Sequence, residues 1–303
     1  MSSILIGPSS FAELDQSPLQ KLSDAGYNII DNPYKRRLTK LELKELLKDD
    51  VCGIIAGLEP FDRDVLKSAK LKVISRVGSG LSNVDLESCE ELGIKVCSTP
   101  NGPTEAVAEL TLGGLLGMLR MIPQMNASLH EGKWEKQIGT QLKGKTVLIV
   151  GYGRIGRRVA ELLRPFAVKL LIVDPNIEAA SLKDECVMSL EDALPLADIV
   201  TFHNSGEACL LGEKEISQMK QSIFLLNVAR GGIISECALA QGIKSGKIAG
   251  AWLDTFGQEP YKGILQDLPQ VILTPHVGSY TEECRAEMEN EAVCNLLRVL
   301  QNG

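Results

Sequence analysis

The sequence predicts an α/β protein built from two doubly wound domains, each with a parallel sheet covered by helices on both faces. Its 303 residues exceed one ordinary compact core. Short apolar runs alternate with amphipathic segments, and the alternation restarts after the Pro/Gly/Ser/Thr-rich stretch 98–104. Apolar residues make up 44% of the chain and aromatic residues only 4%, which fits an α/β protein better than an all-β one.

The first half of the chain predicts five strands and four helices. Thr39 with Glu42 three residues later forms a capping box that begins one of the helices. We expect strands at 3–7, 27–31, 53–56, 72–77 and 94–97, and helices at 18–25, 39–47, 62–69 and 85–92.

The second half opens with a long apolar helix that we expect to run from 106 to about Ile122, with Pro123 marking its end. Glu109 and Arg120 interrupt this segment, so a buried or subunit-interface helix is a better interpretation than a membrane span. Strands are then expected at 146–150, 169–173, 199–203, 224–227, 248–254 and 271–274, and helices at 155–163, 190–194, 213–219, 236–245 and from Thr281 to the end.

Charge and cysteine content exclude several classes of protein. The net charge of −7 argues against a general nucleic-acid or anionic-membrane surface, because phosphate binding needs a positive field. Eight cysteines without a C-x-x-C pair indicate reduced thiols in a cytoplasmic protein, and no metal site is expected. The first ten residues lack a basic region and a long apolar region, so we do not expect a signal peptide.

A glycine-rich turn follows the expected strand 146–150 and opens a helix. Gly151 permits a tight turn, Gly153 lets the backbone approach a pyrophosphate, and Gly156 lets helix and strand pack closely; Arg154 and Ile155 complete the turn. Asp174 ends the next strand, where a carboxylate binds the ribose hydroxyls of a dinucleotide. No arginine follows it, so NAD is favoured over NADP. A glycine turn that binds nothing is the alternative interpretation.

Polar groups follow three strands of the second half. They lie in the segments 227–232, 254–260 and 274–279, and carry Arg230, Glu259 and His276. The carboxyl ends of parallel strands share one edge, so these side chains are expected to converge. Reduction of a ketone needs a proton donor, a cation for the carboxylate and alkoxide, and a group that tunes the donor. Each residue alone is compatible with a structural role, so the joint occurrence carries the prediction.

In order and spacing, these motifs resemble the D-isomer-specific 2-hydroxyacid dehydrogenases. The resemblance covers almost the whole chain, since the loop 76–85 and the helix 105–112 also match, and 32–39 resembles the phosphoglycerate dehydrogenase-like branch. It implies a Rossmann nucleotide domain at 100–279 inserted in a flavodoxin-like substrate domain formed by 1–99 and 280–303. It also implies an NAD-dependent enzyme and a homodimer with the 106–122 helix at its interface.

The resemblance assigns roles by position. His276 exchanges the proton with the substrate oxygen, Glu259 hydrogen-bonds His276, and Arg230 binds the substrate carboxylate. The expected cofactor contacts are the glycine turn with Asp174, and His203, Val228, Ala229, Arg230, Asp254, His276, Gly278 and Ser279. The backbone of Val77, Gly78, Ser79 and Gly80 is expected to bind the substrate carboxylate, although this second glycine turn alone fits a plain turn equally well.

Some features depart from the family pattern. The loop Asn204–Cys209 is shorter than in the family and lacks its proline, and this difference puts the affinity for the cofactor in question. Trp252 stands where a small residue is usual. We expect the serine-sensing C-terminal module of some phosphoglycerate dehydrogenases to be missing.

The identity of the D-2-hydroxy acid stays open. Lys35, Arg36 and Arg37 form a basic triplet in an acidic chain, and Arg36 and Arg37 either bind the phosphate of D-3-phosphoglycerate or are solvated charges. A hydroxypyruvate or glyoxylate reductase is the alternative enzyme. An NAD(H)-sensing binding protein of the same fold would retain the same motifs, whereas a formate dehydrogenase would need no general acid for a ketone.

Overall fold

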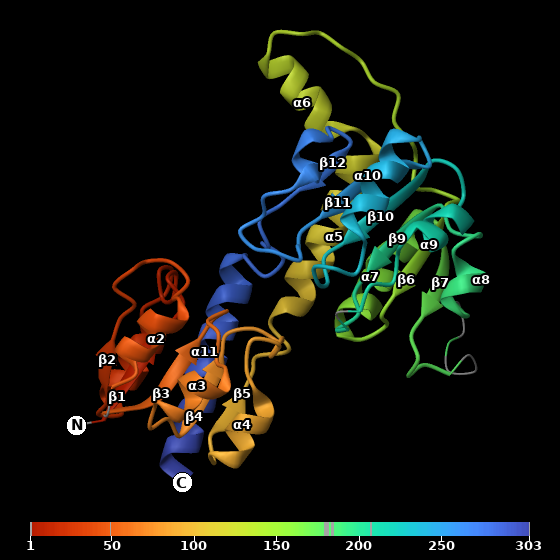
Figure 1. Cartoon of the computed structure of the whole chain (residues 1–303). Coiled ribbons are helices and arrows are strands. Elements are labelled where there is room, and N and C mark those ends of the chain that lie inside the picture. Colours follow the sequence, from red (N-terminus) through yellow and green to blue (C-terminus); the bar gives the residue numbers. More distant parts are fainter. Residues whose placement is uncertain (1, 49, 179–181, 183–184, 207, 303) are drawn as a thin grey trace. The chain divides into compact units, whose positions relative to one another are not determined.

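The chain forms two compact units in a computed structural model that describes residues 2–48, 50–178, 182, 185–206 and 208–302 (Figure 1). Unit 1 comprises Met1–Pro103 and Ser279–Gly303, and unit 2 comprises Thr104–Gly278. Each unit contains its own sheet, so the predicted pair of doubly wound parallel-sheet domains is confirmed.

Unit 1 contains a five-stranded sheet in the order β2-β1-β3-β4-β5, with every neighbouring pair parallel. This is the strand order of flavodoxin-like folds, in which the chain leaves β1 and β3 in opposite directions and opens a crevice between their carboxyl ends. The strands are β1 (Ser3–Ile6), β2 (Asn28–Ile30), β3 (Val51–Ala56), β4 (Val73–Arg76) and β5 (Lys95–Cys97).

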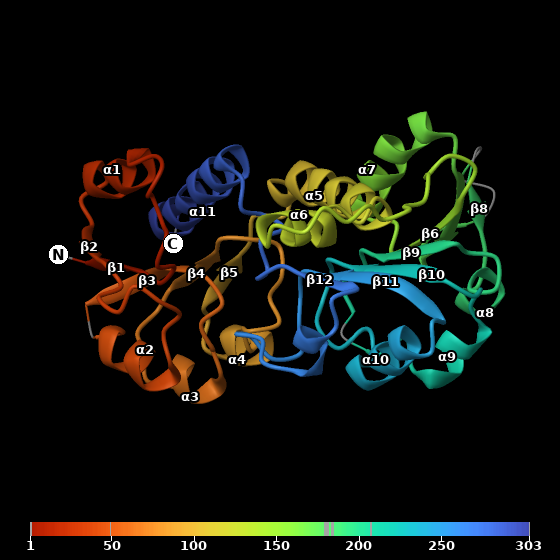
Figure 2. The same ribbon diagram turned by 90° about the horizontal axis from the view of Figure 1, so that it is seen from above.

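Helices cover both faces of this sheet (Figure 2). One face packs against α2 (Lys40–Leu46), α3 (Arg63–Lys67) and α4 (Leu86–Glu91), and the other against α1 (Ser17–Asp24) and α11 (Glu282–Asn302). The predicted capping box is present: the Thr39 side chain accepts from the Glu42 N–H, and the Glu42 carboxylate accepts from the Thr39 N–H. Buried side chains from the strands and from α2, α3 and α4, mostly Leu, Ile and Val, form an apolar core of unit 1.

Unit 2 contains a seven-stranded sheet in the order β12-β11-β10-β9-β6-β7-β8, again with every neighbouring pair parallel. This is the doubly wound order of dinucleotide-binding domains, extended by one strand. The strands are β6 (Thr146–Val150), β7 (Lys169–Val173), β8 (Cys186–Val187), β9 (Ile199–Phe202), β10 (Ile223–Asn227), β11 (Ile248–Leu253) and β12 (Val271–Leu273).

Two apolar layers lie on the faces of the unit 2 sheet. One is formed with α5 (Pro103–Leu119) and α7 (Arg154–Leu163), and the other with α8 (Leu190–Ala193), α9 (Glu213–Gln218) and α10 (Glu236–Lys244). Because both faces are covered, the strands are continuous apolar runs such as TVLIV and KLLIV.

The predicted end of the long helix was wrong. The first helix, α5, ends at Leu119, and a second helix, α6 (Ile122–His130), begins after two intervening residues. Met121 adopts a left-handed backbone between them, with φ of 53°. Pro123 is the second residue of α6. In the first turn of a helix the backbone N–H groups have no partner within the helix, so a proline, which lacks this N–H, fits there; Pro123 therefore begins a helix and does not end one. The two-residue strand β8 also escaped prediction.

Among the described residues, no single helix is long and apolar enough to cross a bilayer. The pair α5 and α6 meets the criteria of length and composition only when the two helices are taken together, and they are bent by 65° at their junction.

Trp252 is the largest fully buried side chain of the described chain and lies on β11 against α5. Its indole Nε1 donates to Thr274 Oγ1 at 3.0 Å, so its polar group is satisfied. Gly114 on α5 makes room for it, since a Cβ atom there would come within 2.4 Å of the indole ring. The large Trp252 side chain is therefore accommodated by a glycine, which has no side chain, at the facing position of α5.

We predict that Gly114→Ala destabilises the protein because the added methyl overlaps the Trp252 ring, with a net cost of about 1–3 kcal/mol. The matched control is Gly113→Ala on the same helix, where a Cβ would have no neighbour within 4 Å. That variant should be neutral or gain up to about 1 kcal/mol from helix propensity. Denaturant unfolding at fixed protein concentration measures both; equal effects would contradict the packing argument.

Candidate active site

The turns that carry the predicted site residues of unit 2 all leave the same edge of its sheet. Every strand of this sheet runs parallel to its neighbours, so the carboxyl ends of β6, β7, β9, β10, β11 and β12 lie at one edge. The glycine turn follows β6, Asp174 follows β7 and His203 follows β9. Arg230 follows β10, Glu259 follows β11, and His276 follows β12, and those three strands are adjacent.

The glycine turn has the close contacts that its three glycines require. Gly151 has φ of 92° and lies against the backbone of Asn204, and a Cβ on Gly156 would meet the Gly151 carbonyl at 2.0 Å. A Cβ on Gly153 would have nothing within 4 Å, so the backbone at the start of α7 is open on this side. The first and third glycines therefore close the turn, and the second leaves space at a helix N-terminus, where a phosphate group fits.

Asp174 is held in place by the turn it faces. Its Oδ2 accepts from the Tyr152 N–H at 2.7 Å, and its Oδ1 accepts from the Asn176 N–H at 2.8 Å. A carboxylate oxygen can accept more than one hydrogen bond, so the group retains acceptor capacity for ribose hydroxyls. Arg154 is exposed at the start of α7, and Ile155 is half-buried beside it.

His203 is a neutral imidazole next to the glycine turn. Burial lowers its pKa to about 3, so it does not carry a charge at neutral pH. Its Nε2 lies 2.9 Å from Thr201 Oγ1, while its Nδ1 and the Oδ1 of Asn204 are buried and have no hydrogen-bond partner within the described ranges. Such atoms fit a site that is completed by a polar ligand. Residue 207 of the short loop after His203 lies outside the described residues.

His276 and Glu259 are in direct contact. His276 Nδ1 lies 2.9 Å from Glu259 Oε2 and 3.1 Å from Oε1. Glu259 Oε1 also accepts from the Phe256 N–H at 3.1 Å, which fixes the carboxylate. The bond to Nδ1 leaves Nε2 of the half-exposed imidazole for a substrate. His276 has φ of 54°, a backbone conformation that is rare for residues other than glycine and is often found at functional sites.

Asp254 positions the turn that carries His276. This buried carboxylate accepts from the N–H groups of Val277 and Gly278, each at 2.9 Å, and from Thr274 Oγ1 at 2.6 Å. The same Thr274 hydroxyl accepts from Trp252. Sequence reasoning missed Thr274; its place at the end of β12, directly before Pro275-His276, was the available signal.

The Arg230 turn packs directly on the turn after β11. A Cβ on Gly231 would come within 1.9 Å of the Phe256 backbone, so glycine is needed for this approach. Asn227 fixes the turn by donating to the Arg230 carbonyl and accepting from the Ala229 N–H. The half-buried Arg230 guanidinium donates to the Ala229 carbonyl at 2.7 Å. Val228 and Ala229 are buried beside it.

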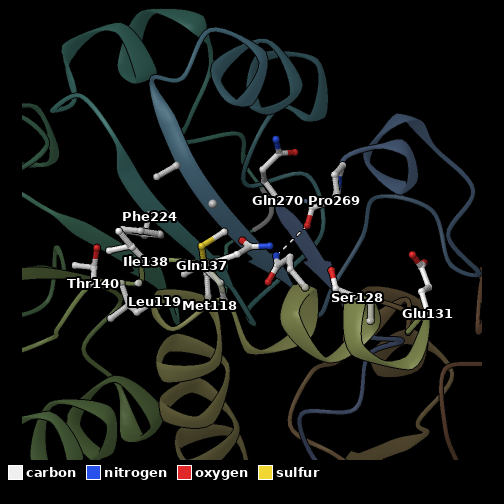
Figure 3. A pocket seen from close by; sticks show the side chains of 16 residues that line it. Met118, Leu119, Ser128, Glu131, Gln137, Ile138, Thr140, Phe224, Pro269 and Gln270 are labelled. Atoms are coloured by element: carbon white, nitrogen blue, oxygen red, sulfur yellow. Dashed lines mark hydrogen bonds between the residues drawn. The ribbon is translucent and has the colours of Figure 1, made fainter. Parts of the chain in front are cut away.

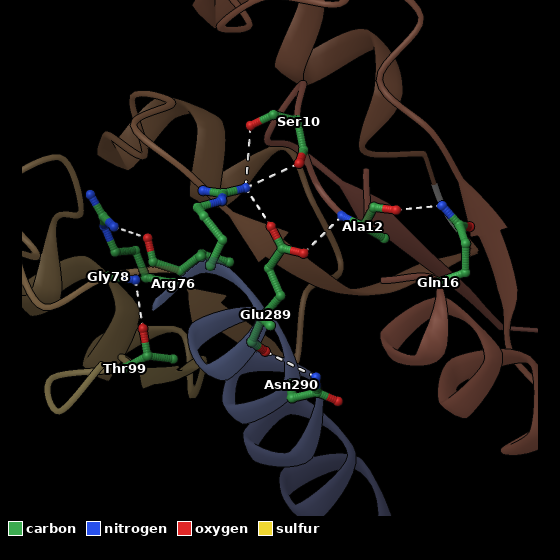
Figure 4. Close-up of polar contacts among 11 residues, drawn as sticks. Ser10, Ala12, Gln16, Arg76, Gly78, Thr99, Glu289 and Asn290 are labelled. Atoms are coloured by element: carbon green, nitrogen blue, oxygen red, sulfur yellow. Dashed lines mark hydrogen bonds and ion pairs between the residues drawn. The ribbon is translucent and has the colours of Figure 1, made fainter. Parts of the chain in front are cut away.

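The other glycine turn, Val77–Gly80, belongs to unit 1. The Gly78 N–H donates to Thr99 Oγ1 at 2.7 Å, and Gly78 has φ of 127° (Figure 4). The Arg76 guanidinium donates to the Val77 carbonyl and lies against Gly78. This puts a cation beside the turn, which the sequence interpretation had not assigned. Ser279 is the first residue of the carboxyl-terminal part of unit 1.

Arg36 forms an ion pair with Glu42, the capping-box residue of α2. Its guanidinium binds Glu42 through two hydrogen bonds of 2.5 and 2.9 Å and lies 5.2 Å from the centre of the Tyr34 ring. The adjacent Arg37 is exposed.

Within the described residues, no group of three or more His, Cys, Asp or Glu side chains is placed to hold a metal ion.

The fold and the turn after β6 define unit 2 as a dinucleotide-binding domain. Residues 112–278 match the family model "D-isomer specific 2-hydroxyacid dehydrogenase, NAD binding domain". The chain belongs to this family, and its cofactor is a nicotinamide dinucleotide, NAD in this family.

Two relatives with curated names align with most of the chain. It is 38% identical over 287 residues to D-3-phosphoglycerate dehydrogenase of Homo sapiens, covering 92% of this chain and 53% of that protein. The chain thus spans about half the length of these curated relatives. It is 34% identical over 273 residues to hydroxypyruvate reductase of Thermotoga maritima, covering 87% of this chain and 89% of the relative.

Solved structures share the fold over the full chain. The TT0316 protein of Thermus thermophilus superimposes with a TM-score of 0.90 and 32% identity, covering 99% of this chain and 97% of that structure. A glyoxylate reductase from Paecilomyes thermophila superimposes with a TM-score of 0.88 and 28% identity, covering 100% and 96%.

We predict that Gly153→Ala weakens NADH binding at least about tenfold without lowering the melting temperature, because the methyl projects into open space needed by the pyrophosphate. The matched Gly156→Ala variant should instead destabilise the fold, since its methyl overlaps the Gly151 carbonyl. Fluorescence titration with NADH and thermal unfolding separate the two effects. Unchanged NADH affinity in folded Gly153→Ala would contradict the placement of the phosphates.

Proposed function

We propose that the protein is an NAD-dependent oxidoreductase that interconverts a D-2-hydroxy acid and its 2-oxo acid. The contact between His276 Nδ1 and Glu259 is the observation that carries the proposal, because it leaves the opposite ring nitrogen for the substrate oxygen. Among the three histidines, His203 is neutral and partly buried and His130 is exposed at the end of α6, which leaves His276 for proton exchange.

The bound nicotinamide would supply or accept the hydride at C2 of the substrate. In the direction of reduction, His276 Nε2 donates a proton to the carbonyl oxygen, and Glu259 stabilises the imidazolium that carries it. Arg230 binds the substrate carboxylate and polarises the carbonyl. In unit 1, the Val77–Gly80 backbone is a further candidate for binding a carboxylate. Asp254 holds the His276 turn through the Val277 and Gly278 N–H groups.

D-3-phosphoglycerate is the first candidate substrate, supported by the 38% identity to D-3-phosphoglycerate dehydrogenases. Hydroxypyruvate is the second candidate, supported by a reductase relative that the chain covers over 89% of its length. A panel of 2-oxo acids assayed by loss of NADH absorbance distinguishes the two, and no oxidation with any of them would contradict the proposed activity.

We predict that His276→Ala lowers kcat by about 10²–10⁴-fold with little change in the dissociation constant of NADH, because the proton donor is lost and the dinucleotide turn is intact. Glu259→Gln should lower kcat by a smaller factor, because Gln can still accept a hydrogen bond but carries no charge to stabilise the imidazolium. Steady-state kinetics and NADH titration test this. Retained turnover in His276→Ala would remove His276 from the assigned role.

We also propose that the protein is a homodimer, and that α6 and the segment that follows it add to the contact expected from the helix at 106–122. None of the α6 residues is buried within the chain, and four large apolar side chains here are exposed: Ile122, Leu129, Trp134 and Ile138, the last at 98%. A pocket of about 550 Å³ lies beside them, lined by Met118, Ile138 and Phe224 among others (Figure 3). A monomer rarely exposes this many large apolar side chains along one segment, and a second copy would cover them.

We predict that the double variant Trp134→Glu/Ile138→Glu is monomeric, because each charge would be buried at the subunit contact. The control is Leu41→Glu on α2, where an apolar side chain is 74% exposed far from this segment in sequence. Sedimentation or light scattering gives the mass. A wild-type monomer, or a dimeric double variant, would contradict this proposal.

Location in the cytoplasm is inferred from the cysteine pattern alone.

A further inference from the structure

The carboxyl ends of β1 and β3 mark the ligand-binding end of unit 1. In a sheet of order β2-β1-β3-β4-β5, the connections diverge between these two strands, and ligands of such folds bind in the crevice that results. Gly7 directly follows β1 and Gly57 directly follows β3. Side chains gathered at these two glycines are therefore positioned to act on a ligand of unit 1.

The Glu59 carboxylate is seated on these two glycines. A Cβ on Gly7 would come within 2.9 Å of its Oε1, and a Cβ on Gly57 within 3.2 Å of the same atom, so both positions need glycine to accommodate the carboxylate. Its Oε2 accepts from the Gly57 N–H at 2.6 Å, and the residue is only 1% exposed. Burial raises the pKa of Glu59, and the nearby charges of Arg76 and Arg37 act against that rise.

The loop that carries Arg37 is tied to the same point. Asn32 is buried, and its amide donates to the Gly7 carbonyl at 2.7 Å and to the Arg36 carbonyl at 2.8 Å. Arg76, the second cation, ends β4 and lies against Gly78 in the Val77–Gly80 turn (Figure 4). Arg37 on a loop and Arg76 at a strand end thus both act electrostatically on one buried carboxylate.

The two neighbouring arginines differ in availability. Arg36 is held by two hydrogen bonds to Glu42, and Glu42 also closes the Thr39 capping box, so a ligand would have to break a helix cap to recruit Arg36. Both arginines are exposed, but Arg37 is not part of the helix cap, and its charge acts on the pKa of Glu59.

We propose that Glu59 is a positioning residue that orients Arg37 and Arg76 at the β1/β3 end of unit 1, and that Arg37 binds an anionic group on C3 of the substrate while Arg36 takes no part. This inference rests on the proposed activity toward 2-oxo acids. The anionic group is a phosphate monoester or a second carboxylate, and both have the oxygen geometry that a guanidinium binds through paired hydrogen bonds.

The kinetic test compares three 2-oxo acids that differ at C3: phosphohydroxypyruvate, oxaloacetate and the uncharged hydroxypyruvate. Arg37→Gln should raise KM for the anionic substrate about 10–100-fold and leave kcat and the KM for hydroxypyruvate nearly unchanged. The matched Arg36→Gln variant should leave all three substrates unaffected. Equal KM values in the two arginine variants would overturn the assignment, and the substrate that shows the effect identifies phosphate or carboxylate.

The Glu59→Gln variant tests the positioning role by the sign of its effect. If Glu59 orients the cations, the loss of its charge raises KM for the anionic substrate with kcat retained. If it only repels anions, the same change lowers KM, and that result would overturn the proposal.

Thermal unfolding with D-3-phosphoglycerate as the probe gives a readout without turnover. The ligand-induced rise in melting temperature should persist in Arg36→Gln and disappear in Arg37→Gln. Absence of turnover with all three acids would contradict the proposed activity, whereas the unfolding data would still decide between the arginines. A rise that is the same in Arg36→Gln and Arg37→Gln would overturn this inference.

Discussion

Asp254 is a buried carboxylate at the end of β11, and it accepts hydrogen bonds from both backbone and side-chain donors of the turn after β12. A buried carboxylate costs several kcal/mol unless such donors surround it, so the turn must keep the conformation that presents them. That conformation puts His276 in the left-handed backbone region and directs its Nδ1 to Glu259. The geometry of the candidate active site therefore depends on a residue that need not touch the substrate oxygen.

The parallel order of the strands explains how much of the site could be predicted from sequence. In a parallel sheet, a residue that directly follows a strand must lie at the shared carboxyl edge, whatever the distance along the chain. Asp174, Arg230 and His276 each follow an apolar run, so their common edge follows from local patterns alone. Glu259 lies six residues beyond β11, and only the structure shows that it reaches His276.

Features that depend on contacts distant in sequence escaped prediction. Arg36 and Arg37 are equivalent as a sequence pattern, yet Glu42 engages the first and leaves the second exposed. Pro123 is compatible with either end of a helix, and the left-handed residue Met121 decides that it begins one. Trp252 was predicted to stand where a small residue is usual, but Gly114, which leaves room for its ring, lies more than a hundred residues away.

Both units stabilise their strand-end loops with buried carboxylates, but they neutralise these charges differently. Asp254 is surrounded by N–H and O–H donors, which fix a turn without adding a positive charge. In unit 1, Glu289 accepts from the Ala12 N–H and pairs with Arg285, which also binds Ser10 in the loop after β1 (Figure 4), while Glu59 faces two arginines. Cations held by buried carboxylates keep a fixed position and retain donors for another anion. In the proposed function, unit 1 would therefore bind a substrate by its charge, whereas unit 2 would place its polar groups for proton exchange.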